Sequence, residues 1–534
     1  MSQRHANLEK LTRQPLDVLV IGGGINGAVS AASLSASGLR VGIIDSRDFA
    51  GFTSQHSSNL VWGGIKYLES LEFDLVNDLC QSRNELLDAF PSTVKEIRFL
   101  TTLSRGFRFT PFMLYLGAWL YWWIGRRRTQ KPKWLSKRRI KAMEPNIDVS
   151  SCAGGIEYSD AYLHDNDARF VFNFVRKAMD NGACAVNYLE AITTTFKYGH
   201  WLTEVRDNTD GRRYKIRTKY LVNAAGAFTD RLNAMSGVAT EHRNLYSKGI
   251  HLIVPGLTNE KRVLAFFADD GRLFFAVPMA HRTCIGTTDT QVDSPDTDIT
   301  TEDRDFVLSN INDMMDLSPP LTPDDIIAER CGVRALAVKR KGGQVEDSLQ
   351  LSREHHVEVN AEEHHVSIFG GKLTDCLNVS EEVREAIASM GATMHAPVQG
   401  WYGEPSDERR REFNERASAL RVDELVANDT GEQLSERLWR RYGEDAFAML
   451  EAIDEDAAMA EVIIEGSGIR RCEIEHIADN ELIVKLEDLL RRRSKLEQLV
   501  SMETLQASTG LREVCDILFG DQAQLRYDEY FAEQ

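Results

Sequence analysis

The sequence predicts a mixed α/β fold followed by an all-α domain, and three observations lead to this prediction. Within residues 17–46, an apolar run, a group of glycines, an alanine-rich segment and a second apolar run predict a strand–helix–strand unit. Two more strand–glycine–helix junctions, at 220–230 and 366–375, repeat part of that pattern. Beyond residue 400, apolar residues recur at spacings of three and four, which predicts amphipathic helices.

The first strand–helix–strand unit carries a nucleotide-binding pattern. DVLVI, residues 17–21, predicts a buried parallel strand. Gly22, Gly24 and Gly27 then fit G-x-G-x-x-G, in which the glycines permit a tight turn, close approach of a pyrophosphate and close helix packing. Asp45, at the end of the second strand, is placed to accept hydrogen bonds from a ribose. The unit therefore predicts a dinucleotide site in a Rossmann-like domain, although the motif does not separate FAD from NAD.

Composition excludes some classes of function. Of the 534 residues, 43% are hydrophobic and 27% are charged, which is typical of a soluble globular protein. The formal net charge of −18 argues against general nucleic-acid binding, which needs a basic face. The eight cysteines form no C-x-x-C pair, and the polar first residues show no secretory leader, so we expect reduced thiols in a cytoplasmic protein. No metal site is predicted.

Three further segments suit an extended cofactor with an anionic substrate. Residues 46–70 form a polar, glycine-bearing loop that ends with Lys66 and Tyr67. RCGVRAL presents Arg334 in a glycine-flanked loop, and VSIFGGKLTD presents Lys372 on a Gly-Gly turn before a predicted helix. Taken singly, each cation is more simply explained as a solvated surface residue, and the loop as a surface loop.

Taken together, these segments resemble one family. IGGGINGA, TSQHSSNLVWGGIKYLE, EYSDAYLHDNDAR, LVNAAGAFTD, KGIHLIVP, IGTTD, GVRAL and FGGKLTD occur in the order seen in the FAD-dependent glycerol-3-phosphate dehydrogenases, which are membrane-associated and reduce quinones. The resemblance covers residues 15–380 and continues more loosely into the tail. It implies a Rossmann-like FAD-binding domain interleaved with an antiparallel-sheet substrate domain over 15–395, and a C-terminal all-α domain over 400–534.

The resemblance also implies which residues bind the cofactor. Gly22, Gly24, Gly27 and Asp45 would hold the ADP half of FAD. The positions implied for the pyrophosphate and the flavin are Thr53, Ser54, Ser57, Asn59, Leu60, Ala225, Gly226, Gly371, Lys372, Leu373 and Thr374. The helix that follows the Gly-Gly turn would favour a reduced, anionic flavin through its dipole.

The implied reaction is the oxidation of sn-glycerol 3-phosphate to dihydroxyacetone phosphate, with hydride transfer to the flavin and electrons passed to a quinone. A dianionic phosphate ester needs converging cations, and Lys66, Tyr67, Arg334 and Lys372 match the family's substrate positions. Arg353 is a further candidate. The expected catalytic residues are His251, Arg334 and Lys372. His251 would be the base, because a histidine near its ordinary pKa can remove the proton of the C2 hydroxyl.

One segment departs from the family pattern. Where relatives commonly have LIHGGLRYLE, this chain has LVWGGIKYLE, so Trp62 replaces a histidine and Lys66 replaces an arginine. The lysine keeps the charge but loses the planar guanidinium fork. The tryptophan removes one possible site of a covalent flavin link, so we expect FAD to be bound non-covalently. The departure also leaves the identity of the substrate open.

A possible membrane segment follows at 111–141. PFMLYLGAWLYWWIG is shorter than the ~20 residues that span a bilayer, and the basic run RRRTQKPKWLSKRRIK comes directly after it. Aromatic residues beside cations suit an anionic membrane surface, which predicts a peripheral protein on the cytoplasmic face of the inner membrane. A core helix followed by a solvated loop explains the pattern equally well. The helical tail is expected to serve packing or a homodimer.

Two alternatives to the leading function stay open at this stage. A related flavoprotein could act on another small alcohol or amine, or pass its electrons to oxygen. A protein of another class could bind a flavin at the membrane surface without turnover.

Overall fold

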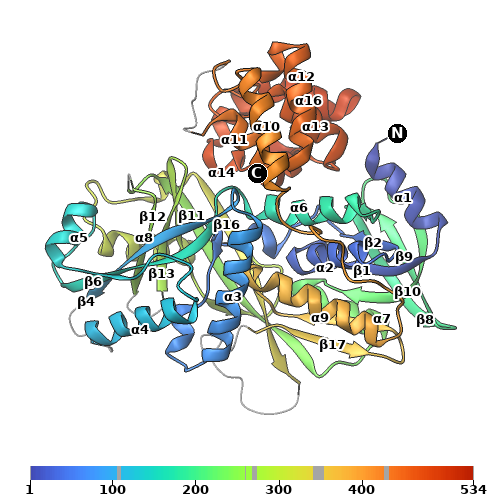
Figure 1. Ribbon diagram of the computed structural model, residues 1–534, viewed down its shortest axis with the longest axis horizontal. Helices are drawn as coiled ribbons and strands as arrows, with labels where there is room; N and C mark the ends of the chain where they lie inside the picture. Colours follow the sequence, from blue (N-terminus) through green and yellow to red (C-terminus); the bar gives the residue numbers. More distant parts are fainter. Residues whose placement is uncertain are drawn as a thin grey trace.

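The computed structural model describes residues 2–104, 110–258, 260–267, 273–340, 354–425 and 432–532. Two sheets lie side by side, and the C-terminal helices form a separate group above them (Figure 1). This arrangement confirms the predicted fold class, with a Rossmann-like domain, a substrate domain built mainly on an antiparallel sheet, and a C-terminal all-α domain.

The first sheet has the predicted strand–helix–strand unit at its centre. Its parallel strands run in the order β18–β10–β1–β2–β7, and β17, β9 and β8 extend it through antiparallel pairs. The strands are β1 (Leu16–Ile21), β2 (Val41–Ile44), β7 (Cys184–Val186), β8 (Leu189–Lys197), β9 (His200–Asp207), β10 (Arg213–Asn223), β17 (His356–Asn360) and β18 (His365–Phe369).

The central strand is buried on both faces because its side chains alternate. Val18 and Val20 belong to the core under helices α2 (Ile25–Ala36), α6 (Asp167–Asp180) and α9 (Cys376–Ser389). Leu19 and Ile21 belong to the opposite core, which α1 (Gln3–Arg13), α7 (Thr229–Ser236) and β9 cover. Because β1 and β2 are parallel neighbours, their carboxyl ends lie together at one edge of the sheet, beside the start of α2.

The second sheet forms the substrate domain. β11 pairs with β16 over nearly its whole length, and β15, β14, β13 and β12 are joined through antiparallel pairs. β12 and β4 are parallel, and β6, β3 and β5 complete the sheet. The strands are β3 (Leu60–Val61), β4 (Val94–Ser104), β5 (Lys133–Leu135), β6 (Cys152–Leu163), β11 (His242–Pro255), β12 (Arg262–Phe267), β13 (Leu273–Met279), β14 (Arg282–Gly286), β15 (Thr290–Val292) and β16 (Ala328–Lys339).

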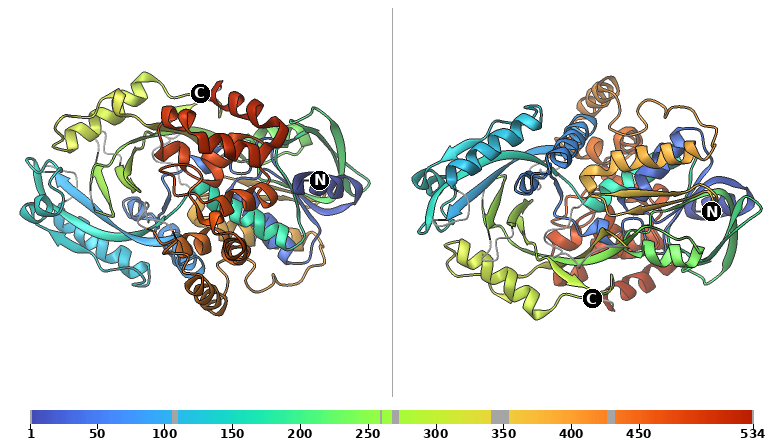
Figure 2. Two further views of the ribbon diagram at one scale, coloured as in Figure 1. Left: turned by 90° about the horizontal axis from the view of Figure 1, so that it is seen from above. Right: turned by 90° about the horizontal axis from the view of Figure 1, so that it is seen from below.

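Helices flank this sheet on both sides. α8 (Thr301–Met314) and α4 (Pro111–Ile124) lie on opposite sides of it (Figure 2), and α3 (Phe73–Ala89) and α5 (Lys137–Met143) lie nearby. α4 is the predicted apolar segment, and it begins after the N-cap Thr110. Within the described ranges, no helix combines the length and the apolar character that crossing a bilayer requires.

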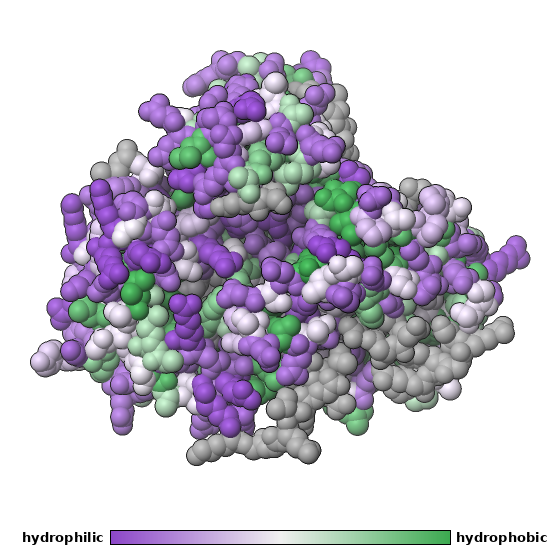
Figure 3. All heavy atoms as spheres, turned by 180° about the vertical axis from the view of Figure 1, so that it is seen from behind, coloured by the Kyte–Doolittle hydropathy of each residue, from purple (hydrophilic) through white to green (hydrophobic). Residues whose placement is uncertain are grey.

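The surface of α4 is unusually apolar. The face of the molecule seen in Figure 3 is mainly hydrophilic, and its hydrophobic residues occur singly or in small groups. On α4, by contrast, Phe112, Met113, Leu116, Leu120 and Trp123 are all between 42% and 67% exposed. A continuous apolar surface of this kind on a soluble domain usually marks an interaction site.

The C-terminal domain packs around its own hydrophobic core. Its helices are α10 (Asp407–Ala419), α11 (Leu434–Tyr442), α12 (Ala446–Glu455), α13 (Arg471–Asn480), α14 (Leu496–Leu499), α15 (Met502–Ala507), α16 (Thr509–Phe519) and α17 (Ala523–Ala532). Segment 435–453, expected to be helical, is split into α11 and α12 at Gly443, whose φ is +57°.

Segment 480–499 differs more strongly from the predicted amphipathic helix. It contains a π-helical turn (Asp488–Arg493) followed by α14. Arg492 and Arg493 in this turn are buried, and both contact the carboxylate of Asp48 at 2.7 Å. The apolar spacing did not indicate that these charged side chains would be buried against the cofactor domain rather than exposed to solvent.

Candidate cofactor and substrate site

The turn between β1 and α2 requires its glycines. Gly22 has φ +111°, and a Cβ there would lie 2.4 Å from the carbonyl oxygen of Ala224. A Cβ on Gly27 would lie 1.9 Å from the carbonyl oxygen of Gly22. Gly24 is the N-cap of α2 and supplies no capping side chain, so the helix start stays accessible to a phosphate.

A cavity of about 440 Å³ opens directly in front of this turn. The predicted residues that line it are Gly22, Gly24, Asp45, Thr53, Ser54, Ala225 and Gly226. Two arginines that sequence reasoning missed, Arg47 and Arg231, also line it. No motif marks either arginine, although Arg47 follows Asp45 closely enough to have been considered. The lining of the cavity suits a dinucleotide phosphate and ribose, because it combines a helix start, an acid and two cations.

Asp45 is anchored by the backbone at the floor of the cavity. Its Oδ2 accepts a hydrogen bond from Gly23 N at 2.7 Å, and its Oδ1 accepts one from Arg47 N at 2.9 Å. Burial raises the pKa of this carboxyl to about 6 despite these bonds. A ribose hydroxyl that donated to Asp45 would favour the ionised form.

The loop after β2 is fixed by the substrate domain, by α2, and by the start of α6 with the residues just before it. Thr53 Oγ1 donates to Val333 O at 2.7 Å, and Ser54 Oγ accepts from Ile25 N at 3.0 Å. Ser57 Oγ donates to Asp167 at 2.9 Å, and Asn59 Nδ2 donates to Asp165 O at 3.0 Å. The side chains of Ser57 and Asn59 therefore hold the loop in place.

Leu60 continues the same loop into the second sheet. It lies in β3, pairs with Tyr162 of β6, and is partly buried. The tryptophan that departs from the family pattern, Trp62, follows it, and its ring centre lies 6.1 Å from Tyr67 and 6.3 Å from Phe275. Trp62 therefore belongs to an aromatic cluster with Tyr67 and Phe275.

The Gly-Gly turn after β18 lies against the start of α2. Gly371 has φ +95°, and Asn26 Nδ2 donates to Gly370 O at 3.2 Å. Leu373 and Thr374 lie in the short 3₁₀ turn that follows, Leu373 partly buried and Thr374 buried.

The side chain of Lys372 extends from this turn toward the loop after β3. Its Nζ lies 4.0 Å from the centre of the Tyr67 ring, a distance typical of a cation–π contact. The structure thus brings together two of the predicted substrate residues that the sequence separates widely. Lys66, next to Tyr67, instead lines a separate apolar cavity beside α4. Arg353 lies outside the described residues.

His251 and Arg334 lie on neighbouring strands of the second sheet. His251, on β11, is only 4% exposed, and among the described residues neither ring nitrogen has a hydrogen-bond partner. The Arg334 guanidinium lies over Gly249, where a Cβ would come within 2.3 Å of Nη2, and it donates to Thr287 Oγ1 at 2.9 Å. Buried ring nitrogens with no protein partner in the described ranges can hydrogen-bond a bound ligand.

The imidazole of His251 is neutral in this state. Burial, with the charges of Arg330 and Arg334, lowers its pKa to about 3. This value is well below the ordinary histidine pKa that the sequence led us to expect. Arg330, which sequence reasoning missed, donates to Ser57 O at 2.6 Å and to Asn59 Oδ1 at 2.8 Å. Arg330 lies four residues before Arg334 on one strand, so strand alternation could have placed both on the same face.

A partly buried histidine close to these arginines, His56, was also missed. The pKa of His56 lies well below its ordinary value because of burial and the nearby charges of Arg491, Arg330 and Arg492. Arg491 comes from the C-terminal domain and donates to the carbonyl oxygen of Gln55. No pattern in the sequence connects the tail with this loop.

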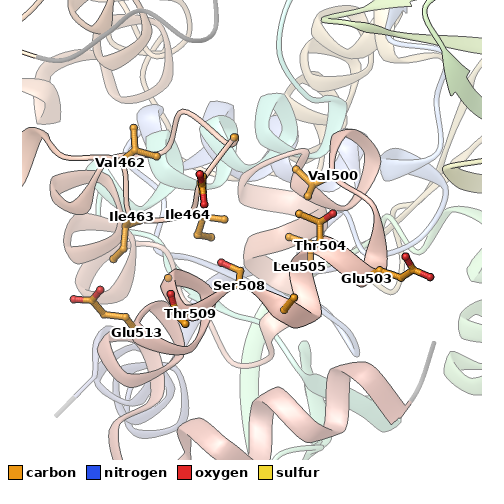
Figure 4. A pocket seen from close by; sticks show the side chains of 14 residues that line it. Val462, Ile463, Ile464, Val500, Glu503, Thr504, Leu505, Ser508, Thr509 and Glu513 are labelled. Carbon is orange, nitrogen blue, oxygen red and sulfur yellow. The ribbon is translucent and has the colours of Figure 1, made fainter.

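Cavity size alone does not identify the site. A larger cavity, of about 840 Å³, lies within the C-terminal domain between residues 462–466 and 500–513 (Figure 4). It is lined by side chains such as Val500, Thr504 and Glu513, and by none of the predicted site residues. The smaller cavity, at the glycine turn, is the one lined by residues that the sequence predicted to bind the cofactor.

Two protein-family models match this chain, and the first of them covers the glycine turn and both strands that carry His251 and Arg334. The profile of the family described as "FAD dependent oxidoreductase" matches residues 17–367, and that of the "C-terminal domain of alpha-glycerophosphate oxidase" matches residues 392–520. The chain is 30% identical to a glycerol-3-phosphate dehydrogenase of Mycobacterium leprae, over 97% of this chain and 86% of that protein. It is also 30% identical to one of Pseudomonas aeruginosa, over 94% of this chain and 95% of that protein.

A solved structure shares the fold. The glycerol-3-phosphate dehydrogenase from Bacillus halodurans, complexed with FAD, superposes with a TM-score of 0.73 at 22% identity, covering 100% of this chain and 97% of that one.

Proposed function

The chain belongs to the family of FAD-dependent glycerol-3-phosphate dehydrogenases, and on this premise we propose that it oxidises sn-glycerol 3-phosphate to dihydroxyacetone phosphate and passes the electrons to a membrane quinone. The observation that carries the proposal is the buried His251 imidazole, which is neutral and has Arg334 on the neighbouring strand. A neutral base beside a fixed cation suits the oxidation of an alcohol that carries a phosphate.

The residues at the first helix fit the ADP half of FAD. A Cβ on Gly22 would fill the turn, and the cavity of about 440 Å³ in front of it has Asp45 at its floor. The turn that contains Gly22, Gly24 and Gly27 would let the pyrophosphate approach the backbone, and Asp45 would accept a hydrogen bond from a ribose hydroxyl. When bound, FAD supplies the acceptor for the hydride that leaves C2 of the substrate.

The substrate phosphate would be held by cations from different elements. Arg334 offers a planar guanidinium and Lys372 offers a point charge. A cation–π contact with the Tyr67 ring holds the Lys372 ammonium in place. Lys66 and Arg353 are further proposed contacts, of which Arg353 lies outside the described residues. A dianion among these groups would be bound by charge-assisted hydrogen bonds.

His251 would take the proton of the C2 hydroxyl as the hydride leaves. Burial and the charges of Arg330 and Arg334 lower the pKa of this imidazole to about 3, so it is unprotonated at neutral pH. A bound dianion would offset those charges and raise the pKa of His251 toward the working pH, where a general base is most effective.

The apolar face of α4 and the basic segment after it would lie on a membrane. Arg126, Arg127, Lys131, Arg138 and Arg139 are exposed in this segment, next to an α4 surface on which Trp123 is 62% exposed. Anionic lipids attract such cations, by about 1 kcal/mol for each one near the surface. We therefore propose peripheral attachment to the cytoplasmic face of the inner membrane, with the C-terminal helices available for a homodimer.

One specific observation keeps a second candidate function open. Trp62 packs against Tyr67 in the position of a family histidine, so the substrate side of the site is altered. A related small alcohol or amine is therefore the second candidate substrate. A flavin-binding membrane protein without turnover is the third candidate function.

A single experiment sorts these candidates. The purified yellow protein is mixed anaerobically with glycerol 3-phosphate, and flavin absorbance is followed. Rapid bleaching supports the proposed function, bleaching only by another alcohol or amine supports the second candidate, and no bleaching by any of them contradicts both.

A further inference from the structure

Three consecutive arginines of the C-terminal domain are buried in the π-helical turn. Arg491, Arg492 and Arg493 are 3%, 2% and 1% exposed. Arg492 and Arg493 each contact the carboxylate of Asp48 at 2.7 Å. Arg491 differs from them: within the described parts of the chain, its guanidinium donates only to the carbonyl oxygen of Gln55, and its Nη1 has no partner. Arg491 is therefore a buried cation that no carboxylate neutralises through an ion pair.

A second buried arginine shows the same feature. Arg330, on β16, is 1% exposed, and it donates to Ser57 O at 2.6 Å, to Asn59 Oδ1 at 2.8 Å and to Gln498 Oε1. All three acceptors are neutral, and no other described residue accepts from its Nε. The molecule thus contains two buried guanidinium groups whose hydrogen bonds are made to uncharged atoms.

These two guanidinium groups are close enough to repel each other. Burial and the charge of Arg330 lower the pKa of Arg491 to about 10, although the acids Asp167 and Glu497 act in the opposite direction. The carboxylate of Asp167 accepts two hydrogen bonds from Ser57 instead. A buried cation without a counter-ion destabilises a protein, so this arrangement indicates a role other than stability.

Both arginines hold the loop that we expect to line the flavin. Arg491 binds the carbonyl of Gln55 and Arg330 binds the carbonyl of Ser57, so their contacts are two residues apart on this loop. Arg330 also lies directly opposite His251 in the pairing of β16 with β11. The pair therefore adds two positive charges to the loop, beside the proposed base.

We propose that Arg491 and Arg330 are positioning residues for the flavin, and that their charges stabilise the negative charge that the ring gains on reduction, an inference that rests on the proposed function. A hydride carries two electrons and one proton, so its transfer from C2 of the substrate to the oxidised ring adds one negative charge. Cations that are buried act more strongly on such a charge than cations in water. The C-terminal domain thereby contributes to the reduction potential of a cofactor that binds to the other domain.

The midpoint potential of bound FAD tests this inference. Arg491→Gln keeps a donor for the Gln55 carbonyl but removes the charge. We expect it to weaken the binding of reduced FAD relative to oxidised FAD about tenfold, which equals a fall of about 30 mV in the potential of a two-electron couple. The potential of the holoenzyme is measured by equilibration with a reference dye, with xanthine and xanthine oxidase as the source of electrons. Arg491→Lys keeps the charge and should retain most of the wild-type potential.

Arg437→Gln is the matched control. Arg437 is also buried in the C-terminal domain, but its Nη2 lies 2.7 Å from the carboxylate of Glu473. Removing one partner of a buried ion pair destabilises a protein, so Arg437→Gln should lower the melting temperature of the oxidised holoenzyme and leave its potential unchanged. Arg491→Gln should do the reverse, with a lower potential and no loss of melting temperature.

Several results would overturn the inference. An unchanged potential in Arg491→Gln would do so, as would an equal fall in Arg437→Gln. If Arg491→Lys has the same potential as Arg491→Gln, hydrogen-bond geometry rather than charge is responsible. If Arg491→Gln is recovered only as unfolded protein, the arginine serves the fold.

The proposed function fails separately. Anaerobic bleaching of the wild-type protein by glycerol 3-phosphate is recorded in parallel, and a lack of bleaching contradicts the proposed substrate. The comparison of potentials still decides the role of Arg491 in that case, because xanthine oxidase supplies the electrons.

Discussion

The Lys372 ammonium lies 4.0 Å from the centre of the Tyr67 ring, and this contact joins the turn after β18 to the loop after β3. We expect Lys372→Met to raise the KM for glycerol 3-phosphate roughly 10–150-fold, since a charged hydrogen bond contributes about 1.5–3 kcal/mol. Steady-state kinetics with a soluble acceptor measures this. Lys219→Met is a matched control, because Lys219 lies 4.9 Å from the Tyr220 ring, away from the site. Equal effects of the two substitutions would contradict the prediction.

Arg334 should control both the affinity for substrate and the titration of His251. Arg334→Met should raise KM strongly, and removing its charge should raise the pKa of His251 from about 3 toward 6.5. Because the base must be neutral, the acid limb of kcat/KM should move to higher pH. The pH at which kcat/KM halves is compared in the two proteins. An unmoved acid limb would remove His251 from the role of base, and an unchanged KM would remove Arg334 from the phosphate site.

The affinity for FAD should depend on the protonation of Asp45. Its pKa is raised to about 6 by burial, and a ribose hydroxyl would favour the carboxylate. Each pH unit below 6 should therefore weaken FAD binding by about tenfold, since binding releases a proton. Fluorescence titration of the apoprotein between pH 5 and 8 measures this. Asp45→Asn should bind FAD more weakly and without this pH dependence; a variant that keeps the same slope would point to another group.

His355 should stabilise the fold below neutral pH and cease to do so in alkali. Its Nδ1 lies 2.6 Å from Asp375 and its Nε2 lies 3.0 Å from Glu382, and although burial opposes it, these carboxylates raise its pKa to about 9. The folded protein binds this proton more tightly, so the stabilisation is complete below pH 6.5 and is lost as the pH rises through 9.

The variant His355→Gln should therefore unfold more easily at pH 6, by about 1.5–3 kcal/mol, and like the wild type at pH 10. Urea unfolding followed by circular dichroism compares them. His5→Gln, at an exposed position of α1, is the control and should change nothing. A constant difference between His355→Gln and wild type across pH would rule out the charged contact.

Attachment to anionic membranes should depend on the basic segment after α4. Replacing Arg138 and Arg139 with Ser should weaken binding to vesicles that contain phosphatidylserine, by about fivefold for each charge at ~1 kcal/mol. Sedimentation with vesicles at low and high salt measures this. Arg212→Ser and Arg213→Ser remove exposed cations from the β9–β10 side and should have no effect. A loss that is equal for both pairs would mean that overall charge, not this surface, drives binding.

Local patterns made the cofactor side of the fold predictable. The apolar run before Gly22 and the glycine spacing predict β1, the turn and α2, because each depends on neighbours in the chain. Trp62 and Lys66 could be identified as departures for the same reason.

Interactions between distant segments could not be read from the sequence. Arg492 and Arg493 look like the solvated face of a helix, and only the fold shows that Asp48 pairs with them. Likewise, the sequence does not show that the side chains of Ser57 and Asn59 donate to Asp167 and to the Asp165 carbonyl. Sequence periodicity carries no information about which remote partner a polar side chain will find.

The buried ion pairs of Asp48 with Arg492 and Arg493 have a consequence for folding. Asp48 is fully buried, and its two arginine partners, Arg492 and Arg493, lie 444 and 445 residues later in the chain. A buried carboxylate deprived of its counter-ions costs about 3–5 kcal/mol. The N-terminal region therefore reaches its full stability only after this later segment has packed against it, so that folding of the cofactor domain depends on the C-terminal domain.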